Sequence, residues 1–189
     1  MMNLDPNWKN IKADDGSFKS LPAGVYKCAV KKTEVKLSKK GQEMLVLSFD
    51  ICEGEYANYF MDLFKKRHEE ATAKGEQAKW PNQAIFYQLT QGDFLPRFKH
   101  CINCFEESNP GFTFTGEEKA LVGKVFGAVM RAEEYRSQRD GEIRTSVKCD
   151  RVIPTSKIAE TKVPDVKKLK EDEQRPALSQ QDWTEPIPF

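Results

Sequence analysis

The 189-residue sequence lacks the groups on which most enzyme classes depend. It has only two histidines, and neither the phosphate-binding pattern GxxxxGK(S/T) nor the serine-hydrolase pattern GxSxG occurs in it. Nucleophilic or acid-base catalysis needs a nucleophile beside a base, or paired carboxylates in a cleft, and no such pair can be named here. We therefore expect a binding protein without a cofactor, and not an enzyme.

Long apolar runs are also missing. No stretch approaches the roughly 20 apolar residues that cross a bilayer, so no membrane span is expected. The opening residues, MMNLDPNWKNIKADDG, are polar and lack the apolar centre of a secretory signal. The five cysteines are an odd number, which does not suggest a complete set of disulfides. We expect a soluble chain with reduced thiols, in the cytoplasm.

The cysteines offer one candidate metal site. Cys101 and Cys104 have the C-x-x-C spacing of half a zinc site, and His100 precedes them. Further ligands would have to come from the remaining thiol and imidazole side chains, which are Cys28, Cys52, Cys149 and His68. None of these forms a second pair with ligand spacing. The alternative, which we favour, is that both cysteines lie as small apolar side chains on the buried face of a helix.

Alternating apolar and polar residues predict a β-hairpin near the start of the chain. Residues 24–37, GVYKCAVKKTEVKL, alternate, but the parity of the apolar positions changes after the central lysine pair, which predicts a β-bulge. Residues 38–42, SKKGQ, have the composition of a turn, and residues 43–51, EMLVLSFDI, return as the second strand. The aromatic residues 56–64, YANYFMDLF, are expected to form the third strand.

The middle of the chain favours helix. Residues 65–92 are rich in lysine and glutamate, which predicts a solvated helix or a mobile insertion, with two helical turns over residues 84–91. Residues 93–108 have apolar side chains at helical spacing and a proline in the first turn. Two further strands are predicted over residues 121–135 and 142–153, and glycines inside the first of them indicate a bulge, a corner or close backbone approach.

The predicted order is three strands, a helical region and two strands, with a bent first strand. That is the order of the OB-fold, a five-stranded Greek-key barrel. We expect a mainly β protein with a polar arm over residues 1–22 and an OB-fold over residues 23–158 that has a helical insertion between strands 3 and 4. Residues 159–181 mix proline with charge, which predicts a disordered linker, and residues 182–189 form a separate C-terminal tip.

Charge and aromatic residues point to a polyanionic ligand. Residues 159–189 hold 5 of the 30 basic residues and 7 of the 29 acidic ones, so the body is mildly basic and the tail mildly acidic. Binding of a single-stranded nucleic acid needs cations along the phosphates and flat rings on which bases stack. In OB-folds the first and last hairpin loops flank the oligonucleotide-binding face, and the two most cationic turns of this sequence fall in those loops.

The candidate contact residues follow from this reasoning. Those from the first hairpin to the end of the insertion are Lys31, Lys32, Lys36, Lys39, Lys40, Tyr59, Phe60, Lys65, Lys66, Arg67, Trp80 and Tyr87. Those of the last hairpin are Arg131, Tyr135, Arg136, Arg139, Arg144 and Lys148. The alternative is that the cations only solvate strand exteriors and that the rings fill a small core.

The final residues, DWTEPIPF, resemble a known ending. Bacterial single-stranded DNA-binding proteins join an OB-fold to a disordered tail that ends in acids followed by Ile-Pro-Phe, and this chain ends in the same three residues. The segment LPAGVYKCAVKKTEVKLSKKGQEMLVLSFDI also resembles the small single-stranded DNA-binding proteins of tailed bacteriophages. Trp183 and Pro186 stand where further acids are usual in that tail.

The resemblance implies binding and protection of single-stranded DNA during phage replication and recombination, in the cytoplasm of the bacterial host. It also implies that the tip docks onto replication and repair proteins, through Asp182, Trp183, Glu185, Ile187, Pro188 and Phe189. A terminal phenylalanine can fill an apolar pocket while its α-carboxylate pairs with an arginine at the rim. Three alternatives stay open: an RNA-binding OB module, a protein-interaction adaptor, and a tail without a ligand. A homo-oligomer is compatible with each of these.

Overall fold

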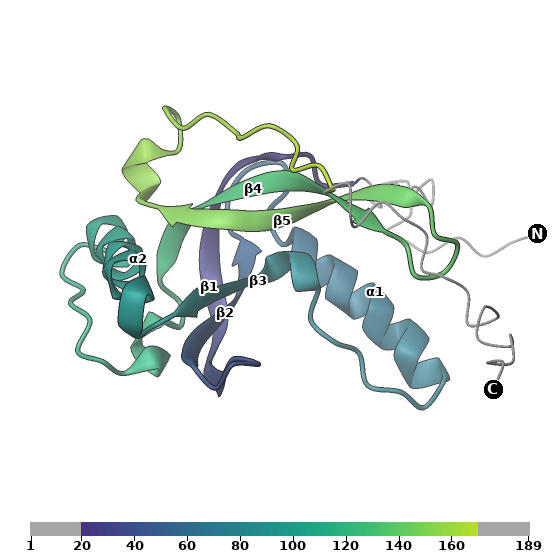
Figure 1. Ribbon diagram of the computed structural model, residues 1–189, viewed down its shortest axis with the longest axis horizontal. Coiled ribbons are helices and arrows are strands. Elements are labelled where there is room, and N and C mark those ends of the chain that lie inside the picture. The colour runs from purple at the N-terminus through teal and green to yellow at the C-terminus, as the bar shows by residue number, and fades with distance from the viewer. Residues whose placement is uncertain (1–19, 170–189) are drawn as a thin grey trace, which may run out of the picture.

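The computed structural model describes residues 20–169 of the chain. These residues form a mainly β structure in which five strands make one antiparallel sheet, in the order β3-β2-β1-β4-β5, with two α-helices packed against it (Figure 1). The strands are β1 (Gly24–Leu37), β2 (Glu43–Ile51), β3 (Ile85–Leu89), β4 (Val125–Arg136) and β5 (Ile143–Ile153). The helices are α1 (Tyr59–Ala73) and α2 (Leu95–Ser108). Neither helix is long and apolar enough to cross a membrane.

Strand β1 is bent and pairs with two neighbours. Residues 24–29 pair with β4, and residues 28–37 pair with β2. The register with β2 shifts between Val30 and Lys32, so Lys31 is an extra, exposed residue and the predicted β-bulge is confirmed. The bend lets one strand serve both halves of the sheet, and it brings the sheet edges β3 and β5 toward each other.

The sheet is open along one seam. Strands β3 and β5 are its two edges and contact each other, but no backbone ladder joins them in the part of the chain that the structure describes. Each of these strands therefore has one side whose backbone groups are not used by the sheet. The prediction of a mainly β protein is confirmed, but in the described residues the five strands form an open antiparallel sheet and not the predicted Greek-key barrel.

The third strand was predicted in the wrong place, because residues 56–64 contain the start of α1. Phe60 and Leu63 bury one face of that helix. Helix α1 begins after Asn58, whose side chain makes no capping hydrogen bond. Instead the buried carboxylate of Asp50 in β2 accepts hydrogen bonds from the backbone N–H groups of Phe60 and Met61, at 3.0 and 3.1 Å. A residue distant in sequence thus supplies the N-terminal cap.

Strand β3 lies where the sequence predicted helical turns. The sequence IFYQL pairs with β2 in antiparallel register, with Phe86 opposite Leu47 and Tyr87 opposite Val46. A β-branched residue and two aromatic residues suit a half-buried strand, and short 3-10 turns at residues 82–84 and 92–94 separate it from its neighbours. The helix predicted between strands 3 and 4 is confirmed as α2, whereas α1 lies between strands 2 and 3.

The core lies between the sheet and α2. Phe49, Phe105 and Phe126 are fully buried, and the ring centroid of Phe126 lies 5.4 Å from that of Phe49 and 5.0 Å from that of Phe105. Gly127 sits where β4 meets β5, and a Cβ added there would lie 2.7 Å from Cγ1 of Ile153, its partner in the ladder. A close approach to a glycine in this strand was predicted, and the group that approaches Gly127 is a side chain of the neighbouring strand.

Residues 159–169, the first part of the predicted linker, contain no helix or strand, but one of them bridges to the sheet. Lys167 makes a parallel bridge with Glu133 in β4. Its backbone N–H donates to the carbonyl of Ala132 at 2.9 Å, and its carbonyl accepts from the N–H of Glu134 at 2.9 Å. This segment, yellow in Figure 1, passes along the sheet. Residues 1–19 of the arm, the rest of the predicted linker and the whole C-terminal tip lie outside the described residues.

Candidate nucleic-acid interface

One face of the sheet carries several of the predicted contact residues. Residues opposite each other in an antiparallel pair project to the same side. The registers of β1, β2 and β3 therefore define three rows on the side away from the core: Lys32, Ser48 and Ile85; Glu34, Val46 and Tyr87; and Lys36, Met44 and Leu89. We call these nine residues the outer face.

Tyr87 is the exposed aromatic residue of the outer face. Its side chain is 54% exposed, while its cross-strand neighbour Val46 is 7% exposed. Lys36 lies on the same side of the sheet, in the neighbouring row and two strands away from Tyr87. The pKa of Lys36 is raised, chiefly by its hydrogen bond to Glu34. An exposed ring on a strand, with lysines on the same face of the sheet, is the arrangement that can stack a base and hold nearby phosphates.

The two lysines of the outer face share one carboxylate. Lys32 and Lys36 both form ion pairs with Glu34, which lies between them on the same side of β1. The hydrogen bonds from Lys32 and Lys36 lower the pKa of Glu34 from 4.5 to about 2. Glu34 was not among the residues predicted from the sequence, although the alternation of residues 32, 34 and 36 in a strand places it on the same side as the two lysines. The three side chains together carry a net charge of +1.

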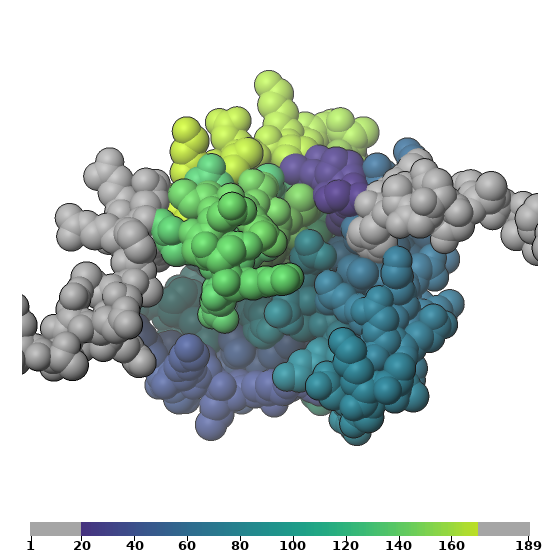
Figure 2. All heavy atoms as spheres, turned by 90° about the vertical axis from the view of Figure 1, so that its right-hand side faces the viewer, coloured from purple at the N-terminus to yellow at the C-terminus, as the bar shows by residue number. Residues whose placement is uncertain are grey.

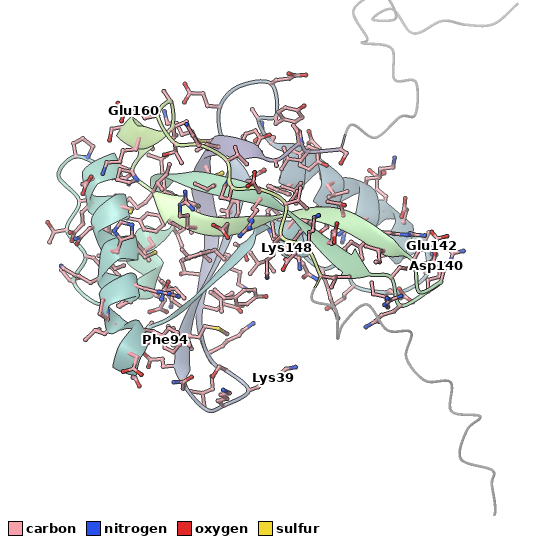
Figure 3. The ribbon with its side chains drawn as sticks, turned by 45° about the horizontal axis from the view of Figure 1, so that its top comes forward. Lys39, Phe94, Asp140, Glu142, Lys148 and Glu160 are labelled. Carbon is pink, nitrogen blue, oxygen red and sulfur yellow. The ribbon has the colours of Figure 1, made fainter. Side chains whose placement is uncertain are left out.

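A hollow of about 440 Å³ adjoins the outer face. It is lined by Asn82, Ile85, Phe86, Tyr87, Lys148, Cys149 and Asp150. Tyr87 of β3 and Lys148 of β5 thus lie at the same hollow, although 61 positions separate them in the numbering. Figure 2 shows a recess between the β4–β5 hairpin, in green, and the β1–β2 hairpin, in violet-blue. The tip of the first hairpin, at Lys39, and that of the second, at Asp140 and Glu142, are labelled in Figure 3.

Most cations of the β4–β5 hairpin already have a partner in the protein. Lys148 pairs with Glu133 at 3.2 Å, and Arg131 pairs with Asp150 at 3.6 Å. Arg144 pairs with Asp140, and the guanidinium of Arg136 donates to the carbonyl of Gly141 at 2.6 Å. Arg139 and Tyr135 are exposed near the hairpin tip. A polyanion that binds here has to compete with these internal partners.

The predicted contacts on and near α1 are separate from the hollow. Lys65, Lys66 and Arg67 are exposed on the helix, and none of them lines the hollow beside Tyr87. Phe60 was predicted to contact the nucleic acid, and this prediction is wrong because its ring is fully buried. Trp80 packs on Phe64 with ring centroids 5.4 Å apart.

The remaining candidates are Tyr59, whose hydroxyl is used in a hydrogen bond within the protein, and three lysines, which are exposed as predicted. The hydroxyl of Tyr59 accepts a hydrogen bond from the N–H of Leu21 at 3.1 Å. Lys39 and Lys40 lie at the tip of the first hairpin and Lys31 lies at the bulge, and all three are exposed. Of the predicted residues, the structure therefore places Lys32 and Lys36 on the same face of the sheet as Tyr87, and Tyr87 and Lys148 at one hollow.

The cysteine pair lies in α2. Burial raises the pKa of Cys101 to about 12 and that of Cys104 to about 11, which favours protonated thiols. Nε2 of His100 lies 3.6 Å from the sulfur of Cys104. Residues 20–169 contain no cluster of three or more histidine, cysteine, aspartate or glutamate side chains that could hold a metal ion. Both thiols pack with the core cluster.

Comparison with known families gives a match but no function. Residues 7–93, fewer than half of the chain, are similar to a family described as a protein of unknown function (DUF669). No curated protein matches the chain. The matched range includes β1, β2, α1 and β3, and therefore the whole outer face. Over this range the chain is similar to DUF669.

Proposed function

We propose that the protein binds single-stranded DNA without sequence preference, on the outer face and in the adjoining hollow. The observation that carries the proposal is the half-exposed ring of Tyr87 between the lysines of β1 and Lys148 of β5. A base stacks on Tyr87, and phosphates on either side of it contact Lys36 and Lys148. Stacking and phosphate contacts tolerate any sequence, because every base has a flat face and every nucleotide a charge.

The order of the strands supports an OB-fold as the scaffold. An OB-fold has a helix between strands 3 and 4, binds oligonucleotides on a face of strands 2 and 3, and has its first and last hairpin loops beside that face. Helix α2 occupies that position, and β2 and β3 carry two thirds of the outer face. We propose that the protein is a variant of this fold in which the seam between β3 and β5 stays open.

The biological role follows from the resemblance noted in the sequence. We propose protection of single strands during phage DNA replication and recombination in a bacterial host, with the C-terminal tip recruiting other proteins. Deleting residues 187–189 should abolish capture of such proteins and leave affinity for oligo-dT unchanged or higher. Equal capture by the truncated chain and the full chain would contradict the role of the tip.

A salt-dependent titration tests the binding proposal. Fluorescent oligo-dT is titrated with the full chain at several salt concentrations, with duplex DNA and single-stranded RNA as competitors. For an oligo-dT short enough to occupy this site alone, three phosphate contacts, at Lys32, Lys36 and Lys148, predict a slope of about −2 in a plot of log affinity against log salt. An affinity indifferent to salt, or a preference for duplex, contradicts the proposal. Preference for RNA would mean that the same site binds single-stranded RNA and not DNA.

A further inference from the structure

A second hollow continues beyond Tyr87 along the open seam. It measures about 440 Å³ and is lined by Phe86, Tyr87, Gln88, Arg97, His100, Cys101, Asp150, Arg151 and Val152. We call it the seam groove. It shares Phe86, Tyr87 and Asp150 with the first hollow, so the two are contiguous. Its volume lies within the range of about 300 to 1,000 Å³ of pockets that hold small ligands, enough for part of a nucleotide chain.

The charge of the seam groove suits a phosphate. Arg97 of α2 and Arg151 of β5 are exposed, and Asp150 is the single carboxylate in the lining. That carboxylate pairs with Arg151 at 3.3 Å and with Arg131 at 3.6 Å, so its charge is already balanced. Arg97 makes no ion pair with residues 20–169, and its guanidinium offers donors in the planar geometry that phosphate oxygens accept.

The walls of the seam groove suit the rest of a nucleotide. Strands β3 and β5 are both edges, so each has backbone groups on its outer side that make no ladder bond within the described chain. Such groups can donate to and accept from bases and sugars of any identity. The ring of Phe86 and the imidazole of His100 add flat surfaces to the lining.

We propose that the single strand continues from Tyr87 into the seam groove, where Arg97 and Arg151 bind its phosphates. This inference rests on the proposed function and extends it, because it assigns α2 to the binding site and lengthens the bound strand. None of the residues contributed by α2 was a candidate for contact with nucleic acid from the sequence, which offered His100 and Cys101 only as part of a metal site.

Substitution of Arg97 with a matched control tests the extension. Arg97→Ala and Lys99→Ala remove the same charge from exposed positions of α2, but Lys99 is not part of the groove lining. Affinities are measured for oligo-dT of about 4 and about 12 nucleotides, the lower and middle range of OB-fold site sizes. Arg97→Ala should weaken binding of the longer strand about fivefold at about 0.1 M salt and make its salt slope less negative by about 0.7.

The shorter strand separates this inference from the proposed function. It should fill the Tyr87 site alone, so Arg97→Ala should leave its affinity unchanged, Lys99→Ala should change neither affinity, and Arg97→Lys should restore the salt slope. If the wild type binds both strands and Arg97→Ala matches Lys99→Ala on the longer one, the seam groove does not hold DNA. If the wild type binds neither strand, the proposed function itself fails.

Discussion

The carboxylate of Glu34 and the ammonium group of Lys36 form an ion pair on the outer face of β1, and Glu34 also pairs with Lys32. One carboxylate therefore occupies two cations that would otherwise attract phosphate. If the outer face binds single-stranded DNA as proposed, the strand has to displace Glu34 from both lysines, and this competition should lower its affinity. On the proposed function, Glu34 should therefore limit how tightly the outer face binds a polyanion.

Replacing Glu34 should tighten binding. Glu34→Gln frees Lys32 and Lys36 and should raise the affinity for oligo-dT about fivefold at about 0.1 M salt, the effect of one further cation. Glu53→Gln is the matched control, because Glu53 forms a comparable ion pair, with Lys27 at 2.7 Å, outside the outer face. Equal changes in the two variants would mean that only net charge matters and that Glu34 has no special position.

The pKa of Glu34 should report the bound strand directly. In the free protein it is lowered from 4.5 to about 2, so its ion pairs stabilise the fold above pH 4.5 and this stabilisation is lost as the pH falls from 4.5 toward 2. When phosphates replace Glu34 as the ion-pair partner of Lys32 and Lys36, the pKa of Glu34 should rise back toward 4.5. NMR titration of the side-chain carboxyl with and without saturating oligo-dT measures this. An unchanged pKa on saturation would show that the lysines keep their internal partner.

Tyr87 should supply the stacking contribution. Tyr87→Ala should cost about 1 to 3 kcal/mol of binding free energy, the usual range for one stacked base, and Tyr87→Phe should retain most of the affinity. Because the ring is half exposed, the free energy of unfolding should change little in either variant. Fluorescence anisotropy with the folded variant measures the affinity. An affinity that Tyr87→Ala leaves unchanged would show that Tyr87 does not contact the DNA.

Asp50 should be a determinant of stability. Its buried carboxylate accepts hydrogen bonds from the N–H groups of Ile51, Phe60 and Met61, at 2.8, 3.0 and 3.1 Å. Asp50→Ala leaves these donors unsatisfied and should lower the free energy of unfolding by about 2 kcal/mol in urea denaturation. Asp62→Ala, an exposed position in the first turn of α1, should cost less than about 1 kcal/mol. Equal losses in the two variants would contradict the capping role.

The part of the fold that depends on local pattern was predictable. The alternation in β1, its change of parity at the bulge, and the helical spacing of α2 all appear in the structure. The third strand was misplaced because aromatic residues suit strands and buried helix faces equally well. Phe60 and Leu63 are three positions apart, which fits a helix, but the cap from Asp50 is a tertiary contact that local patterns do not contain.

The site was predictable only in part, for a related reason. Lys32, Lys36, Tyr87 and Lys148 were identified from residue type, but the sequence did not indicate that Tyr87 and Lys148 share a hollow. Arg97, which belongs to the proposed extension, was not a candidate because its position beside β5 arises where two edge strands meet, and that arrangement depends on the bend in β1. Phe60 was misassigned because an aromatic residue in the sequence does not reveal its exposure.

Mapping the bound strand by NMR tests the central claim most directly. Backbone amide shifts of the full chain are followed as oligo-dT is added at low salt. We expect the largest changes in three ranges: 32–36 and 44–48 on the outer face, and 82–89 around Tyr87, with further changes at residues 148–151 across the hollow. Saturable binding that leaves these residues unchanged and shifts only α1, or no binding at all, would contradict the account.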